Sequence, residues 1–451
     1  MTPQNTVYRL VPETRVIQSN DGWILLNPEK GSWAKLSADA GRLCHEALGM
    51  GSQEIRNLIG GECGQDAASH MLTLFDELQE RDLVAAEPRG LHVHDRRIDM
   101  ESPRYSGPQK VYFVVTDKCN LSCTTCYRQS SYDEGGSADA QYAARLIAMM
   151  LPREVVVTGG EPTLRKDLFD LVGRAGQSAE RVVLATNGTL VDEVMAERIK
   201  DLRCDVQVSI ESHEPGIHDS IRGTGSFEAA MRGIRNLVAA GVGRVELVST
   251  VVDLSSFNVQ AMTELAAELG AEYHMSLFQP VGRGRMADTA TGDAVGFARS
   301  LIQYLKWQWR KVGMPEYASF EEVLDLAPRT NCGAGERVLA VSSRGRIFPC
   351  HLLMDSCEGF EAREAQHFLD QYGTLNLWGL KDVDEMLSCS ECDMRYFCGG
   401  GCRAAAHSAG GRDGRDPRCE AYKIFFRSML WSWDDERPVE VNLDEAWNRT
   451  Q

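Results

Sequence analysis

Short apolar segments alternate with amphipathic segments of helical period between residues 110 and 280. The apolar segments, each of which predicts a β-strand, lie at residues 111–115, 154–158, 181–186, 205–210, 244–251 and 273–278. Helices are predicted between them, at residues 138–151, 167–177, 191–200, 227–240 and 258–269. This alternation is typical of parallel βαβ units, and six strands in series fit an open α/β barrel. The chemistry of such a fold lies at the carboxyl ends of its strands.

Three closely spaced cysteines follow the first predicted strand. Cys119, Cys123 and Cys126 have the spacing Cys-x3-Cys-x2-Cys. Three thiolates at this spacing can hold three irons of one iron–sulfur cube and leave the fourth iron without a protein ligand. An open coordination position is where a metal centre does chemistry, whereas a closed set of four ligands is usually structural or electron-carrying. A zinc site or a buried thiol cluster is the alternative interpretation of these cysteines.

Further motifs follow the next three strands. Gly159, Gly160 and Glu161 follow the second strand, and the two glycines allow the backbone to approach a ligand closely because they lack a Cβ. Asn187 ends the third strand, and Ser209 and Glu211 lie at the end of the fourth. These positions agree with the expectation that the site lies at the carboxyl ends of the strands.

The composition limits the class of protein. A chain of 451 residues is too long for one ordinary core, so we expect two or three domains. The sequence has no apolar run of about 18 residues and no secretory signal, so we expect a cytoplasmic protein. The net charge of −17 argues against nucleic acid or a membrane surface as the main partner. In a reducing compartment, the 14 cysteines favour metal ligation over disulfides.

A second group of cysteines begins near residue 331, where the sequence becomes rich in Cys, Gly and Arg. Its members are Cys332, Cys350, Cys389, Cys392, Cys398, Cys402 and Cys419. The four from Cys389 to Cys402, taken alone, also fit a zinc site. Cys357 is a spare thiol close to Cys350 in sequence.

Residues 1–88 predict a small separate domain. Strands are expected at residues 15–18, 23–26 and 32–36, and Asp21-Gly22 predicts a hairpin turn between the first two. Helices are expected near residues 38–49, 52–60 and 65–81. Three strands followed by three helices indicate a winged-helix-like arrangement with the third strand at an edge. Residues 89–108 predict a linker.

The three cysteines and the motifs after them resemble the radical S-adenosylmethionine (SAM) superfamily over about residues 110–285. The resemblance implies a partial (β/α)6 TIM-type barrel over residues 109–285. It also implies that SAM chelates the open iron of a [4Fe-4S] cluster and that one electron releases a 5′-deoxyadenosyl radical. The family usually has an aromatic residue before the third cysteine, near adenine; this chain has Thr125 there.

The same resemblance assigns SAM contacts. Gly159, Gly160 and Glu161 correspond to the motif that binds the SAM ammonium, and Asn187 corresponds to a ribose contact. Ser209 resembles the first member of a Ser-x-Asp pair, with Glu211 in place of the usual Asp. Arg222 is a candidate partner of the SAM carboxylate, and a surface ion pair is the alternative for it.

The C-terminal cysteines resemble the SPASM extension, expected at residues 329–430 after a helical bridge at 286–328 and before a tail at 431–451. The resemblance implies two auxiliary iron–sulfur clusters, probably of the [4Fe-4S] type. The first cluster would be held by Cys332, Cys350 and Cys402, with either Cys357 or an open iron at the fourth position. The second cluster would be held by Cys389, Cys392, Cys398 and Cys419. His351 stands where sulfatase-modifying members carry a catalytic Asp, so it is a candidate base, with a hydrogen-bonded spacer as the alternative.

Residues 1–88 resemble the PqqD-like recognition domain (RRE) of peptide maturases, which implies that a leader peptide adds as a strand beside Ser32–Leu36. A DNA-binding winged helix is the alternative, which the acidity of the chain disfavours. We therefore predict a maturase that binds a ribosomal precursor peptide and installs a thioether or carbon–carbon cross-link, with electrons from a flavodoxin or ferredoxin. A radical SAM enzyme that modifies a folded protein, as sulfatase or quinoprotein maturases do, and a non-catalytic iron–sulfur sensor are the alternatives.

Overall fold

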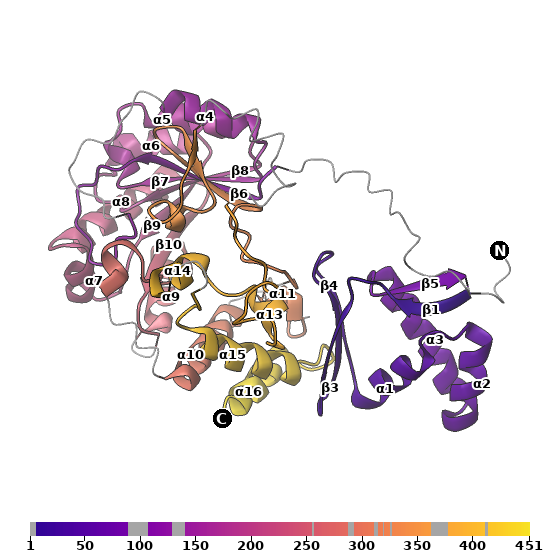
Figure 1. Ribbon diagram of the computed structural model, residues 1–451. Helices are drawn as coiled ribbons and strands as arrows, with labels where there is room; N and C mark the ends of the chain where they lie inside the picture. Colours follow the sequence, from indigo (N-terminus) through magenta and orange to yellow (C-terminus); the bar gives the residue numbers. More distant parts are fainter. Residues whose placement is uncertain are drawn as a thin grey trace.

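An N-terminal domain, a central α/β barrel and a cysteine-rich C-terminal region follow one another along the chain (Figure 1). The computed structural model describes residues 6–88, 107–128, 140–254, 257–286, 293–310, 314–318, 320–324, 327–361, 378–410 and 414–451. The predicted linker at residues 89–108 therefore lies almost entirely outside the described residues.

Six parallel strands form the barrel, and all six were predicted to within about one residue. They are β6 (Lys110–Thr116), β7 (Glu154–Gly159), β8 (Arg181–Thr186), β9 (Asp205–Ser209), β10 (Val245–Val251) and β11 (Glu272–Leu277). The helices between them are α4 (Ala140–Met149), α5 (Leu168–Ala175), α6 (Glu193–Asp201), α8 (Ser226–Ala240) and α9 (Val259–Glu268). A further helix, α7 (Pro215–Arg222), was not predicted, because its short sequence is mostly polar and buries only His218.

Apolar side chains between the strands and the helices form the barrel core. Val155 and Val157 of β7 are fully buried, and so are Ala143 and Ile147 of α4. Strands that are covered by helices read as continuous apolar runs, which is why this part of the fold is easily recognised in the sequence.

The C-terminal region extends the barrel sheet, which the sequence did not predict. Strand β12 (Val338–Ser342) pairs in parallel with β6, and β13 (Arg346–Phe348) and β14 (Phe360–Glu361) continue the sheet antiparallel. The order is β11-β10-β9-β8-β7-β6-β12-β13-β14. The pairing covers the edge of β6 that would otherwise carry open backbone groups, so the cysteine-rich region is built onto the barrel.

The N-terminal domain contains the predicted three-stranded sheet and three helices. They are β2 (Arg15–Ser19), β3 (Gly22–Asn27), β4 (Ser32–Leu36), α1 (Ala38–Ala47), α2 (Ser52–Cys63) and α3 (Gln65–Glu80). Two more strands, β1 (Thr6–Leu10) and β5 (Val84–Pro88), pair antiparallel and were missed. Each is short, and β5 borders the segment that predicts a linker, so neither has a clear signal of its own.

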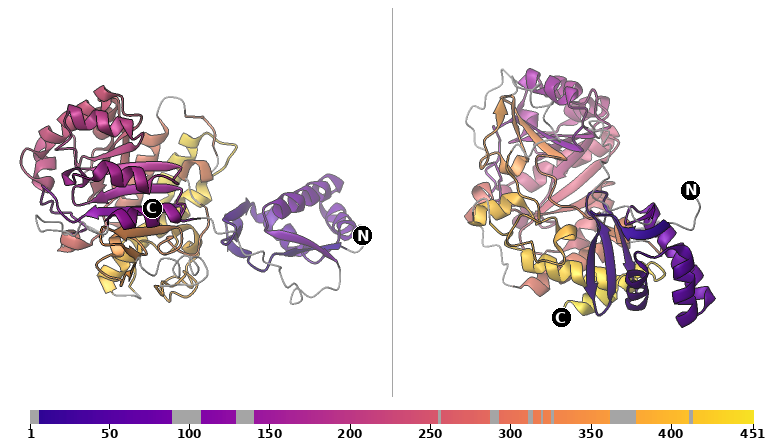
Figure 2. Two further views of the ribbon diagram at one scale, coloured as in Figure 1. Left: turned by 90° about the horizontal axis from the view of Figure 1, so that it is seen from above. Right: turned by 45° about the vertical axis from the view of Figure 1, so that its right-hand side comes forward.

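The sheet of this domain is buried on both faces. Leu25 and Leu36 face the helices of the domain, whereas Ile24, Leu26 and Trp33 pack into a core with the C-terminal region. Figure 1 and the right-hand view of Figure 2 show β3 and β4 beside the C-terminal helices. The N-terminal domain is therefore docked on the rest of the chain through an apolar face.

Aromatic contacts and one lysine hold this interface. Trp33 makes edge-to-face contacts with Phe320 and Phe397, with ring centroids 5.4 and 5.5 Å apart. The Lys35 Nζ donates to the carbonyls of Leu430 and Trp433 at 3.0 and 2.8 Å, at the end of α15 (Cys419–Ser432). Burial lowers the pKa of Lys35, and the carbonyls at a helix C-terminus compensate by stabilising the cation.

Helices make up most of the remaining C-terminal structure. They are α10 (Ala294–Trp309), α11 (Phe320–Leu324), α13 (Arg395–Cys398), α14 (Arg403–Gly410), α15 and α16 (Val439–Arg449), with short 3-10 turns η3 (Pro162–Leu164), η4 (Gly282–Met286) and η5 (His351–Leu353). Leu443 of α16 is buried with Ile302 of α10 and Met429 of α15, so the segment expected to be a tail forms part of a core.

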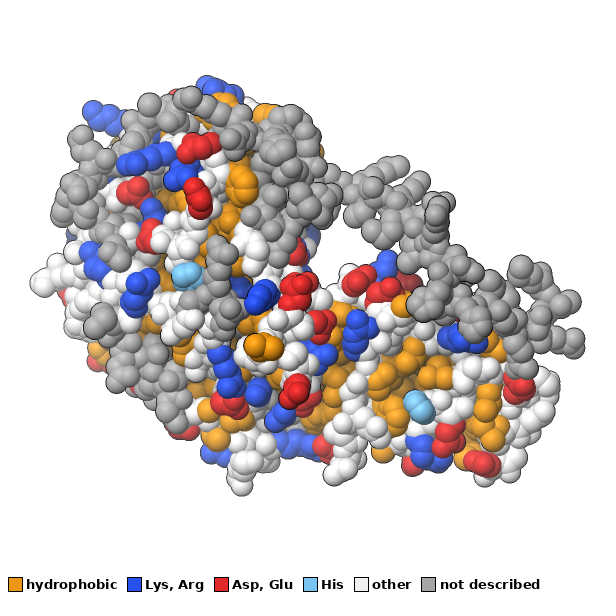
Figure 3. All heavy atoms as spheres, viewed as in Figure 1, with side chains coloured by type: hydrophobic (Ala, Val, Ile, Leu, Met, Phe, Trp, Pro, Cys, Tyr) orange, Lys and Arg blue, Asp and Glu red, His pale blue; other side chains and the backbone are white. Residues whose placement is uncertain are grey.

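In Figure 3, acidic and basic side chains are interspersed over the described part of the face shown. None of the described helices has both the length and the apolar character needed to cross a membrane.

Replacing Trp33 by Ala should destabilise the docked domain. Trp33 is 7% exposed and fills the space between Phe320 and Phe397, so we expect a loss of about 3–5 kcal/mol, measured by chemical denaturation. Val16→Ala, at a side chain that is 41% exposed in the same sheet, should change stability by less than about 1 kcal/mol. Equal effects of the two substitutions would contradict the docked arrangement.

Candidate active site

The loop with the first three cysteines leaves the carboxyl end of β6. Cys119 is buried, whereas Cys123 and Cys126 are partly exposed. The backbone N–H of Leu121 donates to the Cys119 Sγ at 3.4 Å. Burial raises the pKa of Cys119 to about 11, so this thiol keeps its proton at neutral pH unless a metal replaces it.

The Gly-Gly-Glu motif at the end of β7 packs directly against this loop. The N–H of Gly160 donates to the Thr116 carbonyl at 2.8 Å, and the N–H of Glu161 donates to the Lys118 carbonyl at 2.7 Å. A Cβ on Gly160 would lie 2.0 Å from the Lys118 oxygen, and one on Gly159 would lie 2.3 Å from the Thr116 oxygen. The glycines were expected to admit a ligand; in the structure they admit the backbone of the cysteine loop.

Two other elements hold the opposite side of the loop. The N–H of Arg283 in η4 donates to the Cys126 carbonyl at 2.9 Å, and its guanidinium Nη1 donates to the Ser122 Oγ at 3.0 Å. The N–H of Thr124 donates to the Ile221 carbonyl near the end of α7 at 2.9 Å. Arg283 was not predicted, although the neighbouring residue Gly282 has a φ of +62° and faces the Cys126 carbonyl, where only glycine fits easily.

Glu161 presents a buried carboxylate to the same region. Its side chain accepts hydrogen bonds from Thr163 Oγ1 at 2.6 Å, Thr186 Oγ1 at 2.6 Å and the N–H of Asn187 at 2.7 Å. Within the described part of the chain, no basic side chain forms an ion pair with it. A buried carboxylate held by neutral donors is favourable for an ammonium group that enters the site. Thr163 and Thr186 were missed by the sequence analysis.

Asn187 connects the end of β8 to the cysteine loop through hydrogen bonds. Its Nδ2 donates to the Asn120 Oδ1 at 2.8 Å, and its Oδ1 accepts from the Thr189 N–H at 2.9 Å. The Asn120 Nδ2 in turn donates to the Thr189 Oγ1 at 2.8 Å. The residue expected to contact a ribose therefore supports the neighbour of Cys119 through hydrogen bonds of its own.

Glu211 and Arg222 form a buried ion pair at the end of β9, 2.6 Å apart. The second oxygen of Glu211 accepts from the Thr250 N–H at 2.8 Å. Burial raises the pKa of the Cys123 thiol, and the nearby Arg222 guanidinium opposes that effect. Arg222 thus lies beside the cysteine loop, and a carboxylate ligand would share its guanidinium with Glu211. Ser209, at the end of the same strand, is half-buried.

Comparison with known proteins agrees with this geometry. The sequence model of the radical SAM superfamily matches residues 113–268. The mycofactocin maturase MftC of Mycobacterium tuberculosis is 27% identical over 356 residues, which cover 75% of this chain and 87% of that protein. The chain is a radical SAM enzyme. Its cofactors are S-adenosylmethionine and the [4Fe-4S] cluster of that superfamily.

Two further similarities extend the comparison. An AdoMet-dependent heme synthase of Methanosarcina barkeri is 27% identical over 334 residues, 68% of this chain and 94% of that protein. SuiB of Streptococcus suis, solved with S-adenosylmethionine, has a TM-score of 0.54 at 14% identity and covers 91% of this chain and 99% of its own. The likeness to SuiB shows that the two chains share a fold over most of their length.

Four of the C-terminal cysteines of the radical SAM enzyme line one cavity. They are Cys389, Cys392, Cys398 and Cys419, the set that the sequence assigned to one auxiliary cluster. Burial, followed by the nearby thiol of Cys419, raises the pKa of Cys398 to about 12. The structure therefore brings Cys419 to the same cavity as the three cysteines that precede it in the sequence.

The other set of cysteines lies near η5. Burial, and then the thiols of Cys402 and Cys332, raise the pKa of Cys350 to about 12. Cys350, Cys357 and Cys402 also belong to one packed cluster of side chains. Among the described residues, no three His, Cys, Asp or Glu side chains are close enough together to share a single metal ion.

His351 lies between the barrel and the C-terminal region. The centroid of its ring is 3.8 Å from that of Tyr112 and 5.2 Å from that of Tyr127. Its Nδ1 is 3.6 Å from the Cys350 Sγ. Burial, followed by Lys110 and Arg128, lowers its pKa to about 3. An imidazole with a pKa lowered in this way is neutral at neutral pH; its role as a base or as a hydrogen-bonded spacer stays a prediction.

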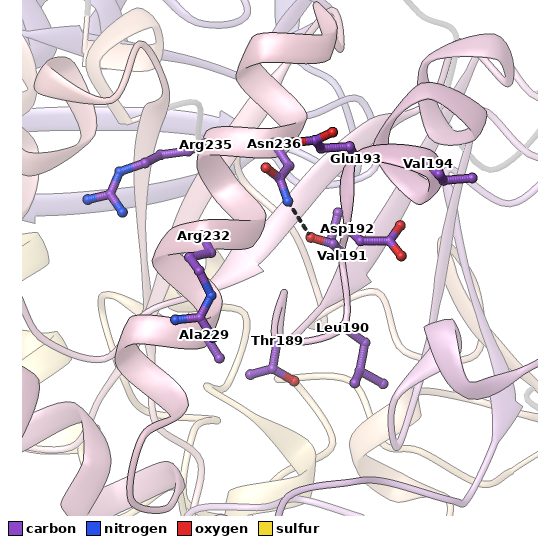
Figure 4. A pocket seen from close by; sticks show the side chains of 10 residues that line it. All are labelled: Thr189, Leu190, Val191, Asp192, Glu193, Val194, Ala229, Arg232, Arg235 and Asn236. Carbon is purple, nitrogen blue, oxygen red and sulfur yellow. Dashed lines mark hydrogen bonds between the residues drawn. The ribbon is translucent and has the colours of Figure 1, made fainter.

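The groove in Figure 4 is separate from these sites. It lies between α6 and α8 and is lined by Leu190, Val194, Arg232, Arg235 and neighbouring residues. None of its lining residues was predicted to be functional. Its single described link to the cysteine loop is Thr189, which is hydrogen-bonded to Asn120.

Replacing Gly160 by Ala should prevent assembly of the SAM-binding cluster. The new Cβ would lie 2.0 Å from the backbone oxygen of Lys118, so the cysteine loop must move. We expect loss of about four irons per chain, measured by iron analysis and EPR spectroscopy, with the C-terminal cysteines unaffected. Gly173→Ala is the control, because nothing lies within 4 Å of its Cβ position. A Gly160→Ala protein with full iron content would refute the packing argument.

Proposed function

We propose that this radical SAM enzyme binds a ribosomal precursor peptide by its leader and installs a thioether or carbon–carbon cross-link. The observation that carries the proposal is the position of β4 at an edge of the N-terminal sheet. Among the described strands, β4 pairs with β3 only, so an extended peptide can add to its other edge through backbone hydrogen bonds. Identity within the family does not decide the substrate, since a heme synthase is as similar in sequence as MftC.

The comparisons favour a peptide. The name of MftC describes a maturase. SuiB, which shares the fold over most of this chain, has also been solved with its precursor peptide SuiA. In this chain, Arg81 Nη1 donates to the Trp33 carbonyl of β4 at 2.8 Å, so one acceptor of this strand is already engaged by a side chain.

The site residues have distinct proposed roles. Cys119, Cys123 and Cys126 hold the cluster, and the buried Glu161 carboxylate accepts the ammonium group of SAM. Arg222, supported by Glu211, contributes positive charge beside the cluster loop. When bound and reduced by one electron, SAM supplies the radical that abstracts hydrogen from the peptide. The packed residues around the site keep water away from it.

The C-terminal cysteines are proposed to hold two auxiliary clusters. Cys389, Cys392, Cys398 and Cys419 line one cavity and suit the second cluster. Cys332, Cys350 and Cys402 suit the first, and Cys357, which packs against the same apolar cluster as Cys350 and Cys402, is proposed as the fourth ligand. The clusters would accept the second electron of the oxidation, and a flavodoxin or ferredoxin would supply the first electron to the SAM cluster.

The activity is tested with the peptide encoded by a short reading frame beside the gene. The anaerobically reconstituted enzyme, with SAM and dithionite, should remove two hydrogen atoms per cross-link, observed by mass spectrometry, and form one 5′-deoxyadenosine per cross-link. Formation of 5′-deoxyadenosine with no change in the mass of the peptide would refute the proposed substrate. A folded protein that is modified faster than the peptide would favour the alternative substrate class.

The mode of leader binding has its own test. In an added strand, only alternate residues direct their N–H groups toward the neighbouring strand. N-methylation of one alternating set of leader residues should therefore weaken binding by about tenfold or more, measured by fluorescence anisotropy on the full-length enzyme. N-methylation of the other set should have little effect. Equal sensitivity at successive positions would exclude strand addition.

A further inference from the structure

Three consecutive glycines connect the two sets of C-terminal cysteines. Gly399, Gly400 and Gly401 lie between Cys398 and Cys402, and their φ angles are +64°, +78° and +70°. Non-glycine residues rarely adopt this conformation. The segment therefore makes a tight left-handed turn, and the two cysteines at its ends belong to different proposed clusters.

The side chain of Arg329 passes directly over this turn. A Cβ on Gly399 would lie 2.8 Å from the Arg329 Nε and 3.2 Å from its Cγ. The backbone N–H of Arg329 donates to the Tyr396 carbonyl at 2.8 Å, which fixes the residue against α13. The groups that interact electrostatically with the guanidinium include Cys332 of the first set and Cys398 of the second. Arg329 is thus close to both sets of cysteines.

The guanidinium has no anionic partner in the described part of the protein. Its Nε is buried without a hydrogen-bond partner, and no described carboxylate forms an ion pair with it. The other charged groups here do not neutralise it. Arg337 is a second cation; Arg403 donates to the carbonyls of Gly400 and Lys381; and Asp416 is bonded to the N–H groups of Cys402 and Arg418.

Arg329 is partly buried and its Nε is fully buried, and a cation that is removed from water without a counter-ion is destabilised. Burial and the neighbouring Arg337 act in the same direction and lower the pKa of Arg329, whereas the two cysteines oppose them. An iron–sulfur cluster with thiolate ligands is an anion. The position therefore makes physical sense when anionic clusters lie on either side of the glycine turn.

We propose that Arg329 is a shared cation between the two auxiliary clusters and raises the reduction potential of both. This inference rests on the ligand sets given under the proposed function. A fixed positive charge stabilises the reduced form of a cluster, which carries one more negative charge than the oxidised form. The positive charge of Arg329 therefore makes the clusters easier to reduce. They become better acceptors of the electron that is released when the peptide radical forms its cross-link.

The test is a redox titration of the full-length enzyme in which Cys119, Cys123 and Cys126 are replaced by Ala, so that only auxiliary clusters contribute to the EPR signal. Dithionite supplies the electrons. Arg329→Gln should lower the ratio of reduced to oxidised cluster at a given potential about tenfold for both clusters, equivalent to about 59 mV for a one-electron couple. Arg329→Lys, which retains the charge, should remain near the parent value.

Arg344→Gln is the matched control, because Arg344 is exposed in the same region and should leave both potentials unchanged. Unchanged potentials in Arg329→Gln, at full iron and sulfide content, overturn the inference alone. If Arg329→Gln loses iron, the neutral variant Arg329→Met replaces it and should lower both potentials; unchanged potentials in that variant overturn the inference. If the parent protein itself holds no auxiliary iron, the proposed ligand sets are wrong instead.

Discussion

Backbone hydrogen bonds between the end of β7 and the cysteine loop position everything else in the active site. The N–H groups of Gly160 and Glu161 bond to carbonyls of the loop that follows β6, and both bonds need a contact that a Cβ would prevent. Because β6 and β7 are neighbours in a parallel sheet, their carboxyl ends meet at one edge. Glu161 follows at once, so its carboxylate is buried beside the cysteines.

The charges in the two halves of the enzyme are complementary to different cofactors. Glu161 is a buried anion with neutral hydrogen-bond donors around it, which suits the ammonium of SAM. In the C-terminal region, Arg329 is a partly buried cation whose Nε has no hydrogen-bond partner, which suits the anionic clusters proposed there. Each arrangement becomes more favourable when a group of opposite charge binds beside it.

The sequence predicts the barrel well, because its strands and helices have strong periodic signals. Residues 111–115 and 154–158, for example, are apolar runs that only a strand covered by helices requires. Cys389, Cys392, Cys398 and Cys419 line one cavity, and their role as ligands of one cluster stays a prediction. Hydrogen-bond partners were harder to predict from the sequence. The hydrogen bond between Asn187 and Asn120 depends on side-chain directions that a motif does not specify, and so does the ion pair between Glu211 and Arg222.

Contacts between distant segments were also beyond the sequence. The pairing of β12 with β6 joins residues more than 200 positions apart, and neither segment contains a signal for its partner. The same holds for the docked N-terminal sheet. The apolar pattern of β4 indicates that Trp33 is buried, but it does not indicate whether Trp33 joins the core of its own domain or a core shared with the C-terminal region. Its actual neighbours, Phe320 and Phe397, could be found only in three dimensions.

The docking has a structural consequence for the proposed second cluster. Trp33 of β4 contacts Phe397, and Phe397 directly precedes Cys398. Ile24, Leu26 and Trp33 share one apolar core with Cys389. Since cores are closely packed and transmit small displacements, the sheet proposed to receive the leader and the cysteines proposed to hold a cluster cannot move independently. A domain attached only by a linker would have no such connection to the redox centres of the enzyme.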